Sequence, residues 1–407
     1  MRWTVLCMML FGVTVAAYAK DGLDGRTIVV TGGTQTSVSV SVTLPYDGPV
    51  PETTVVVLDK ETGAICPATV RQGQLVFIPG ELKPKEKRTY QVKVLDKTES
   101  PKVAIAKVEG KDELTVTVNG EHFTTYHYSN DDKKPFLWPV CAEGGATITR
   151  NWPMGETEGS QDHPHHKSIW TAYGDLNGVD CWGEGEDSGY QQSGEVTFGS
   201  GDAYGWVRAK NVWQDKDHKP VIDEEREYRF YASPAGARLF DETVTFAGAY
   251  GDVKFADTKE GGLMAFRIRP GMEAAKGGQI VNAEGLRGET ACWGKPSPWC
   301  DYYGEISGVG TRGIAVFDHP SNLRYPTRWH VRAYGLNGAN CFGLSYFTEK
   351  EQKAKGEAPL NGDYLLKAKD TLTFNYRVMI HSGDSEIAQV AARYADYATP
   401  PGARWGE

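Results

Sequence analysis

Residues 38–44 read VSVSVTL, a run in which apolar and polar side chains alternate without a break. Because successive side chains of a β-strand point to opposite faces of a sheet, this two-residue period predicts a strand with one buried face. Residues 53–58, 89–95 and 113–118 show the same alternation, and turn-forming residues separate them. These runs predict a small β-sandwich over residues 20–119.

A second and larger group of strand-like runs follows Asn119 and Gly120. Its members are residues 123–128, 205–212, 226–231, 238–246, 263–269, 313–317, 329–334, 341–347 and 371–380. Residues 387–394 alone show the helical spacing i, i+3, i+4, i+7, and Pro400 ends that pattern. The sequence therefore predicts an all-β protein: a small sandwich domain, then a larger antiparallel β domain over residues 120–407 that closes with one helix.

The charge balance of the chain is acidic. Lys and Arg number 44 against 53 Asp and Glu, which gives a formal net charge of -9. An acidic surface repels phosphate backbones and anionic lipids, so neither nucleic acid nor a membrane surface is an expected partner. No stretch beyond the N-terminus approaches the roughly 18 consecutive apolar residues of a membrane span.

The N-terminus indicates export. Arg2 precedes a mostly apolar stretch, and Ala17-Tyr18-Ala19 is a small-x-small cleavage site, so residues 1–19 are predicted to be a secretory signal peptide. We therefore expect a periplasmic or extracellular protein. Export permits disulfides, and the short, turn-rich loop between Cys292 and Cys300 makes that pair the first candidate. Buried free thiols are the alternative for the other four cysteines.

Residues 139–200 differ from the rest of the chain. They are rich in Gly, Trp, Asp, Glu and His and poor in alternating runs. Long loops without regular structure are uncommon unless they are functional, so the chemistry is expected in this segment and in the strands that face it.

Three of the nine histidines lie in one motif, because residues 162–166 read DHPHH. Pro164 excludes a helix interior, and in an extended chain His163 and His165 share one face while His166 points the other way. Two imidazoles on one face can bind a divalent metal, or they can act as acid and base near neutral pH. The alternative is a packed loop in which these histidines only make hydrogen bonds.

A second motif, DTKEGG at residues 257–262, precedes a predicted strand in which alternation places Arg267 and Arg269 on one face. Arginines directed at a cavity can hold a carboxylate, a sulfate or sugar hydroxyls, and Glu260 could act as a general acid or base. An ion-pair ladder on a solvated strand is the alternative interpretation.

A third cluster joins DHPSN at residues 318–322 to RWHVR at residues 328–332. A two-residue period aligns Arg328, His330 and Arg332 on one face, so a basic stripe is predicted inside an acidic protein. His319 belongs to the same cluster. His381, at the end of the last strand, either joins this region or only precedes the helix.

Tryptophans are frequent in the loop-like, Gly-rich segments. Trp can stack on the apolar face of a pyranose ring and donate its N–H to a hydroxyl group, although single tryptophans also close the ends of sandwiches. The six are Trp138, Trp152, Trp170, Trp182, Trp293 and Trp299. The common GxSxG, GxxxxGK[ST], HExxH and EF-hand patterns are absent from the sequence, which argues against the commonest hydrolase, nucleotide and calcium sites.

Five ordered motifs together resemble a secreted bacterial family that is labelled methane oxygenase PmoA: KPFLWP at 134–139, DHPHH, DTKEGG, DHPSN and RWHVR. The resemblance covers residues 123–381. Methane oxidation itself is not implied, because a particulate methane oxygenase subunit crosses the membrane several times. The resemblance implies a large antiparallel β-supersandwich, similar to galactose mutarotase and its polysaccharide-processing relatives.

The leading hypothesis is a secreted carbohydrate-active enzyme that performs hydrolysis, β-elimination or epimerisation. His165 or His166 with Glu260 would supply acid and base, as mutarotase-like sites do with a histidine and a carboxylate. The residues expected to bind the carbohydrate substrate are His163, Lys259, Arg267, His319, Arg328, His330, Trp170 and Trp182.

Two alternatives stay open at this point. One is a glycan-binding protein of the periplasm or cell surface without catalysis. The other is a metal-dependent enzyme that uses His163 and His165 as ligands, whereas the leading hypothesis requires no cofactor.

Overall fold

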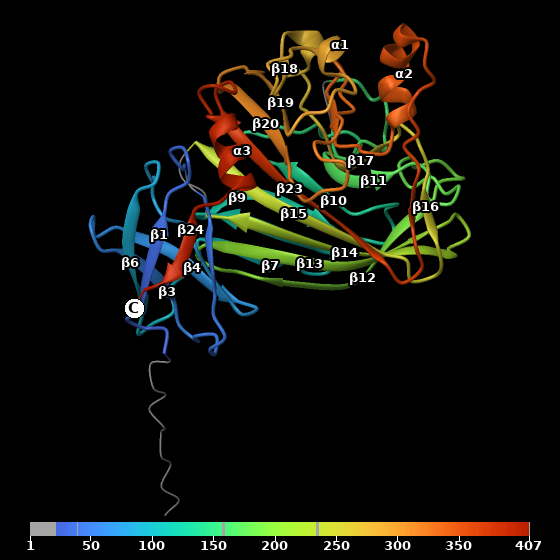
Figure 1. Cartoon of the computed structure of the whole chain (residues 1–407). Coiled ribbons are helices and arrows are strands. Elements are labelled where there is room, and N and C mark those ends of the chain that lie inside the picture. Colours follow the sequence, from blue (N-terminus) through green and yellow to red (C-terminus); the bar gives the residue numbers. More distant parts are fainter. Residues whose placement is uncertain (1–21, 39, 157–158, 233–235, 407) are drawn as a thin grey trace, which may run out of the picture.

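The structure is a computed structural model that describes residues 22–38, 40–156, 159–232 and 236–406. Strands make up 45% of it and helices 7%, so the predicted all-β class is confirmed. Three sheets of seven, seven and eight strands account for most of the strands, and Figure 1 shows the first standing at one end of the other two. The predicted signal peptide lies outside the described residues.

The first sheet contains the run that opened the sequence analysis. Val40, Val42 and Leu44 are buried, so the predicted alternation holds, although the strand itself begins only at Val42. The strand order is β2-β5-β4-β3-β6-β1-β24. The bounds are β1 (Thr27–Thr31), β2 (Val42–Pro45), β3 (Val55–Asp59), β4 (Ile65–Arg71), β5 (Gln74–Phe77), β6 (Lys87–Val94) and β24 (Gly402–Trp405).

The second sheet has the order β21-β17-β11-β10-β9-β8-β7. Its strands are β7 (Val103–Lys107), β8 (Glu113–Val118), β9 (Glu121–His127), β10 (Phe136–Val140), β11 (Ile169–Tyr173), β17 (Gly261–Arg267) and β21 (Leu336–Gly338). Every pairing in it is antiparallel.

The third sheet has the order β12-β13-β14-β15-β23-β20-β19-β18. Its strands are β12 (Tyr190–Gly199), β13 (Tyr204–Gln214), β14 (Pro220–Tyr231), β15 (Ala237–Ala247), β18 (Gln279–Asn282), β19 (Trp299–Ile306), β20 (Gly310–Asp318) and β23 (Thr371–Ser382). Side chains from the second and third sheets form one continuous hydrophobic core. A two-stranded sheet of β16 (Val253–Phe255) and β22 (Tyr364–Leu366) completes the strands.

The sheets do not divide where the sequence placed the domain boundary. β7 and β8 pair within the second sheet, so the change of sheet comes between Val94 and Val103 rather than after residue 119. The C-terminal strand β24 returns to the first sheet and pairs with β1. Arg71 of β4 forms an ion pair with Glu227 of β14 at 3.1 Å, so the first and third sheets are in contact.

The helices correct two strand predictions. Residues 341–347 were expected to form a strand, but α2 (Leu344–Lys355) begins inside them, and within residues 329–334 only Trp329 forms an isolated bridge, to Ala339. α1 (Glu289–Cys292) was not foreseen. The predicted C-terminal helix exists as α3 (Val390–Ala398), ends before Pro400 as expected, and a single 3₁₀ turn lies at Ala274–Lys276.

All six cysteines of the described chain are buried free thiols. The predicted Cys292–Cys300 disulfide is therefore wrong, and burial raises the pKa of the Cys292 thiol to about 11. Among the described residues, no helix is long and apolar enough to cross a membrane.

One charged cluster lies inside the core between the two larger sheets. The Arg226 guanidinium contacts Glu224 at 2.7 Å and Glu242 at 3.6 Å, and all three side chains are fully buried. Thr171 of β11 donates a hydrogen bond of 2.7 Å to Glu242. One guanidinium thus faces two carboxylates, and burial raises the pKa of Glu242 to about 7 despite the nearby Arg226.

This cluster predicts a specific pH dependence of stability. The pKa of Glu242 is raised from an ordinary 4.5 to about 7 in the folded state, so its contribution to stability is present at acidic pH and is lost as the pH rises toward 7. Glu242→Gln should therefore flatten the fall of the thermal midpoint between those pH values. The exposed Glu349→Gln, measured in the same buffers, should follow the native protein, and a Glu242→Gln curve parallel to the native one would contradict the prediction.

Candidate functional site

The outer face of the second sheet carries a compact aromatic layer that is separate from the main core. Phe136, Trp170 and Ala265 lie in register across β10, β11 and β17, so their side chains share one face. Trp182, from the loop after β11, and Leu336 pack on the same layer. The histidine motif reaches this face directly before β11.

The DHPHH motif forms a turn rather than an extended segment. The backbone N–H of His166 donates to the carbonyl of His163 at 3.0 Å, and His163 has a φ of 44°. The predicted separation of His166 from the other two rings is therefore wrong. Ring centroids lie 4.8 Å apart for His163 and His166, 5.7 Å for His163 and His165, and 4.5 Å for His165 and His166.

Two buried arginines hold this turn in place. Arg150 donates to the Asp162 carboxylate at 2.7 Å and to the His163 carbonyl at 2.8 Å. Arg267, at the end of β17, donates to the same carboxylate at 2.8 Å and to His166 Nδ1 at 3.1 Å. Both hydrogen bonds of Arg267 go to residues of the turn, so Arg267 is a positioning residue for the turn. The sequence had predicted it to bind the substrate.

His166 is fixed and neutral. Its ring stacks between His163 and Trp170, at centroid distances of 4.8 Å and 5.2 Å. Burial, followed by the charges of His165 and Arg267, holds the pKa of His166 well below its usual value. Since Nδ1 accepts from a guanidinium, His166 is suited to a structural role.

His165 is the free member of the group. In the described part of the chain neither of its ring nitrogens has a hydrogen-bond partner, and its ring meets the edge of Trp182 at 6.0 Å. Burial and the positive charge of Lys134 lower the pKa of His165 to about 4. This half-buried imidazole is therefore neutral at pH 7 and can accept a proton or a hydrogen bond from a ligand.

Unpartnered hydrogen-bonding groups collect around Trp182. The indole N–H groups of Trp170 and Trp182 are buried and have no partner, and the same holds for Nδ1 of His330. The Trp182 ring contacts Trp170 at 5.4 Å and His330 at 6.3 Å. Buried polar groups in folded proteins are normally satisfied by protein groups or by ordered water, so these three distinguish the cluster from the rest of the core.

Lysines and carboxylates support the loop that carries Trp182. Lys134 donates to the Trp182 carbonyl at 3.0 Å and pairs with Glu184 at 2.9 Å. Lys167 pairs with Glu184 at 3.3 Å and with Asp132 at 2.5 Å. The charges of Lys134 and Lys167 lower the pKa of Glu184 in spite of its burial, so this carboxylate is ionised and committed to the lysines.

The structure does not bring Glu260 to the histidines. Its carboxylate pairs with Lys259, and its backbone lies against Gly174, beyond the Tyr173 end of β11. The histidine turn precedes Ile169, at the other end of that strand, which is about 13 Å long. Burial raises the pKa of Tyr334, which stacks on His163, and the carboxylates of Glu260 and Asp162 raise it further.

The remaining predicted residues lie in two places. His330 borders the cluster, and Arg332 covers the Trp293 ring at 3.7 Å, while Arg328 donates to the Gly294 carbonyl at 2.6 Å. His319 lies elsewhere, bonded to Ser321 at 2.8 Å and edge-on to a tyrosine of α3.

No group of three His, Cys, Asp or Glu side chains within the described ranges is placed to hold a metal ion. The rings of His163 and His165 meet edge to face rather than side by side. The proposed metal ligands therefore gain no third partner.

Sequence reasoning missed two groups of the site. Tyr334 stacks on the His163 ring at 5.2 Å and under the Arg267 guanidinium at 4.4 Å. Its position two residues after the RWHVR motif was the available signal. Arg150 carried no local signal, because only tertiary contacts reveal its role.

Removal of the Arg150 guanidinium tests the support of the turn. Arg150→Leu should lower the free energy of unfolding by about 3 kcal/mol, because it removes one of the two guanidinium groups bonded to the Asp162 carboxylate and the donor to the Asp162 carbonyl. Arg208→Leu, at a half-exposed ion pair with Glu225, is the matched control and should cost less than about 1 kcal/mol. Equal losses in urea titrations would show that Arg150 is no more than a surface charge.

The model of a family described as a family of unknown function (DUF6807) matches residues 113–395, from the start of β8 to within α3. No curated protein matches the chain.

Proposed function

The chain belongs to this family of unknown function, and we propose that it is an exported carbohydrate-active enzyme whose sugar substrate binds at the histidine–tryptophan cluster. In this proposal His165 is the general base. The observation that carries it is a neutral imidazole without a partner, placed among aromatic rings beside unsatisfied indole N–H groups. The signal-like N-terminus and the resemblance to the secreted family labelled methane oxygenase PmoA support the location and the ligand class.

The ligand class follows from the groups that the structure leaves free. The charged side chains of the cluster are paired with one another, so they offer little to a free ion. The groups without hydrogen-bond partners include the indole N–H of Trp170 and of Trp182 and Nδ1 of His330. Aromatic faces with a few hydrogen-bonding groups suit a sugar, which presents both apolar C–H faces and hydroxyls.

The reaction class follows from the carboxylates. Hydrolysis of a glycosidic bond usually requires two carboxyl groups across the bond, one of them protonated. Asp162 and Glu184, which border the histidines, are both ion-paired, and neighbouring cations lower the pKa of each. A neutral His165 instead favours abstraction of a proton from the sugar, as the first step of an epimerisation or a β-elimination.

A glycan-binding protein without turnover is the second candidate. It is favoured by one specific observation: Glu260, the expected partner of the histidines, pairs with Lys259 at the far end of β11. This candidate predicts saturable sugar binding without product, and larger losses for Trp182→Ala than for His165→Ala.

Single substitutions test the proposed base. His165→Ala should lower kcat on an active glycan by roughly 10²–10⁴-fold, because a positioned base contributes about that much. Glu260→Gln should leave turnover nearly unchanged, since its exposed pair lies apart from the cluster. Products are followed as reducing ends, as unsaturated ends and as anomeric or epimeric change across a panel of glycans.

The pH profile provides a second readout. The pKa of His165 is about 4, so the base is available above that value, and kcat/KM should rise through about pH 4 and stay level toward neutrality. His218→Ala, at an exposed histidine on the turn between β13 and β14, is the control for the loss of a histidine outside the cluster. A variant without His165 that keeps full turnover on every active substrate overturns the assignment.

A further inference from the structure

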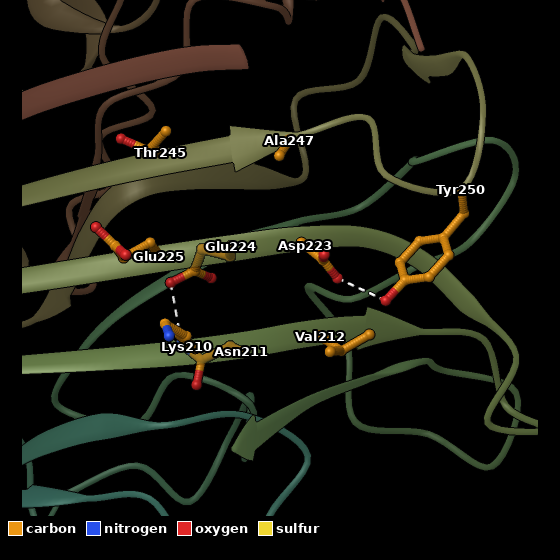
Figure 2. Close-up of a pocket in the computed structure, with 9 residues that line it drawn as sticks. All are labelled: Lys210, Asn211, Val212, Asp223, Glu224, Glu225, Thr245, Ala247 and Tyr250. Carbon is orange, nitrogen blue, oxygen red and sulfur yellow. Dashed lines mark hydrogen bonds between the residues drawn. The ribbon is translucent and has the colours of Figure 1, made fainter. Parts of the chain in front are cut away.

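A pocket lies on the open face of the third sheet, away from the histidine cluster. Figure 2 shows it as a shallow groove across β13, β14 and β15, with the Tyr250 ring at one end. Its volume is ≈ 480 Å³, within the range of small-molecule sites. The lining residues are Lys210, Asn211, Val212, Asp223, Glu224, Glu225, Thr245, Ala247 and Tyr250.

Tyr250 is an exposed aromatic ring held in one orientation. Half of its surface is accessible, and its hydroxyl donates to Asp223 Oδ1 at 2.6 Å. This hydrogen bond raises the pKa of the phenol to about 12, so the hydroxyl stays protonated at neutral pH. The loop is also constrained, because Gly251 has a φ of 139° and a Cβ on Gly248 would lie 2.7 Å from the Lys367 carbonyl.

The charges in the groove are already paired. Lys210 contacts Glu195 at 2.6 Å, and Glu225 contacts Arg208 at 2.7 Å. Asp223 accepts from Tyr250, as described above. The surface between them consists of a threonine hydroxyl, Val212 and Ala247. Lys210 and Glu225 already form ion pairs, so they attract a free ion only weakly. A neutral ligand with hydroxyl groups can still form hydrogen bonds with these paired side chains and with the threonine hydroxyl.

We propose that this groove binds a neutral glycan chain, with a pyranose face against the Tyr250 ring. Along β14 the open face continues from Asp223 to Glu227, a distance of about 13 Å, and ends at the ion pair with Arg71 of the first sheet. The aromatic ring stands at one end of a polar track that is longer than one sugar unit. No acid or base of the groove is free for catalysis, so the groove binds and does not react.

This surface and the histidine cluster use different residues on opposite outer faces of the two packed sheets. Thr245 and Asp223 alternate with core residues of the third sheet, just as Trp170 alternates with core residues of the second. A substitution in one site should therefore leave the other site unchanged.

The experiment uses the full exported chain and affinity electrophoresis in gels that contain xyloglucan, laminarin or polygalacturonate. We expect retardation by at least one neutral polymer. Tyr250→Ala should weaken it roughly tenfold, because an aromatic face is lost. Tyr250→Phe keeps the ring and should stay much closer to the native protein. Both substitutions are at the surface, and equal thermal midpoints would verify folding.

His165→Ala and Trp182→Ala separate this inference from the proposed function. Retardation that persists in both variants and falls in Tyr250→Ala supports the groove, whatever happens to turnover. Retardation that is lost in Trp182→Ala and unchanged in Tyr250→Ala overturns the inference and leaves the cluster as the glycan site. Binding to polygalacturonate alone, or to none of the three polymers, also overturns it.

Discussion

Strand β11 is buried on both faces, and the candidate site depends on this constraint. All five of its residues are buried. Toward the core, Thr171 donates to the buried Glu242 carboxylate of the third sheet. Toward the outside, Trp170 supports the His166 ring and the Trp182 ring. A strand fixed from both sides allows the histidine turn before it and the tryptophan loop after it to meet in a defined geometry.

The same constraint explains which strands the sequence predicted and which it did not. β13, β14, β15 and β23 border solvent along much of one face, so their residues alternate and their positions were predicted. β11 has no solvent-exposed face, so its residues show no two-residue period. The strand was therefore not predicted within residues 139–200. Residues 341–347 were predicted to form a strand because they are mostly apolar. The polar residues that reveal the helix α2 follow only after Phe347.

The structure brings together some of the predicted site residues and separates others. The histidine motif, Trp170, Trp182, Arg267 and His330 do meet. The assumption of an extended chain failed because Pro164 is compatible with a turn, and the turn stacks His163 on His166. Glu260 was chosen by residue type, and its separation from the histidines follows from the register of β11 with β17, which no single sequence can display.

The buried basic residues bind other groups of the protein. The basic residues concentrated in an acidic chain were expected to face a ligand, but Arg150, Arg267, Lys134 and Lys167 bind carboxylates and loop carbonyls of the protein itself. Their burial is tolerable only because each is paired, and that pairing leaves them little capacity for a substrate. The proposal therefore assigns recognition to neutral groups: the His165 imidazole, Nδ1 of His330, two indole N–H groups and the aromatic faces around them. Neutral hydrogen-bonding groups beside aromatic faces discriminate by shape and by hydroxyl pattern rather than by charge, which is why the proposal assigns a sugar to this cluster.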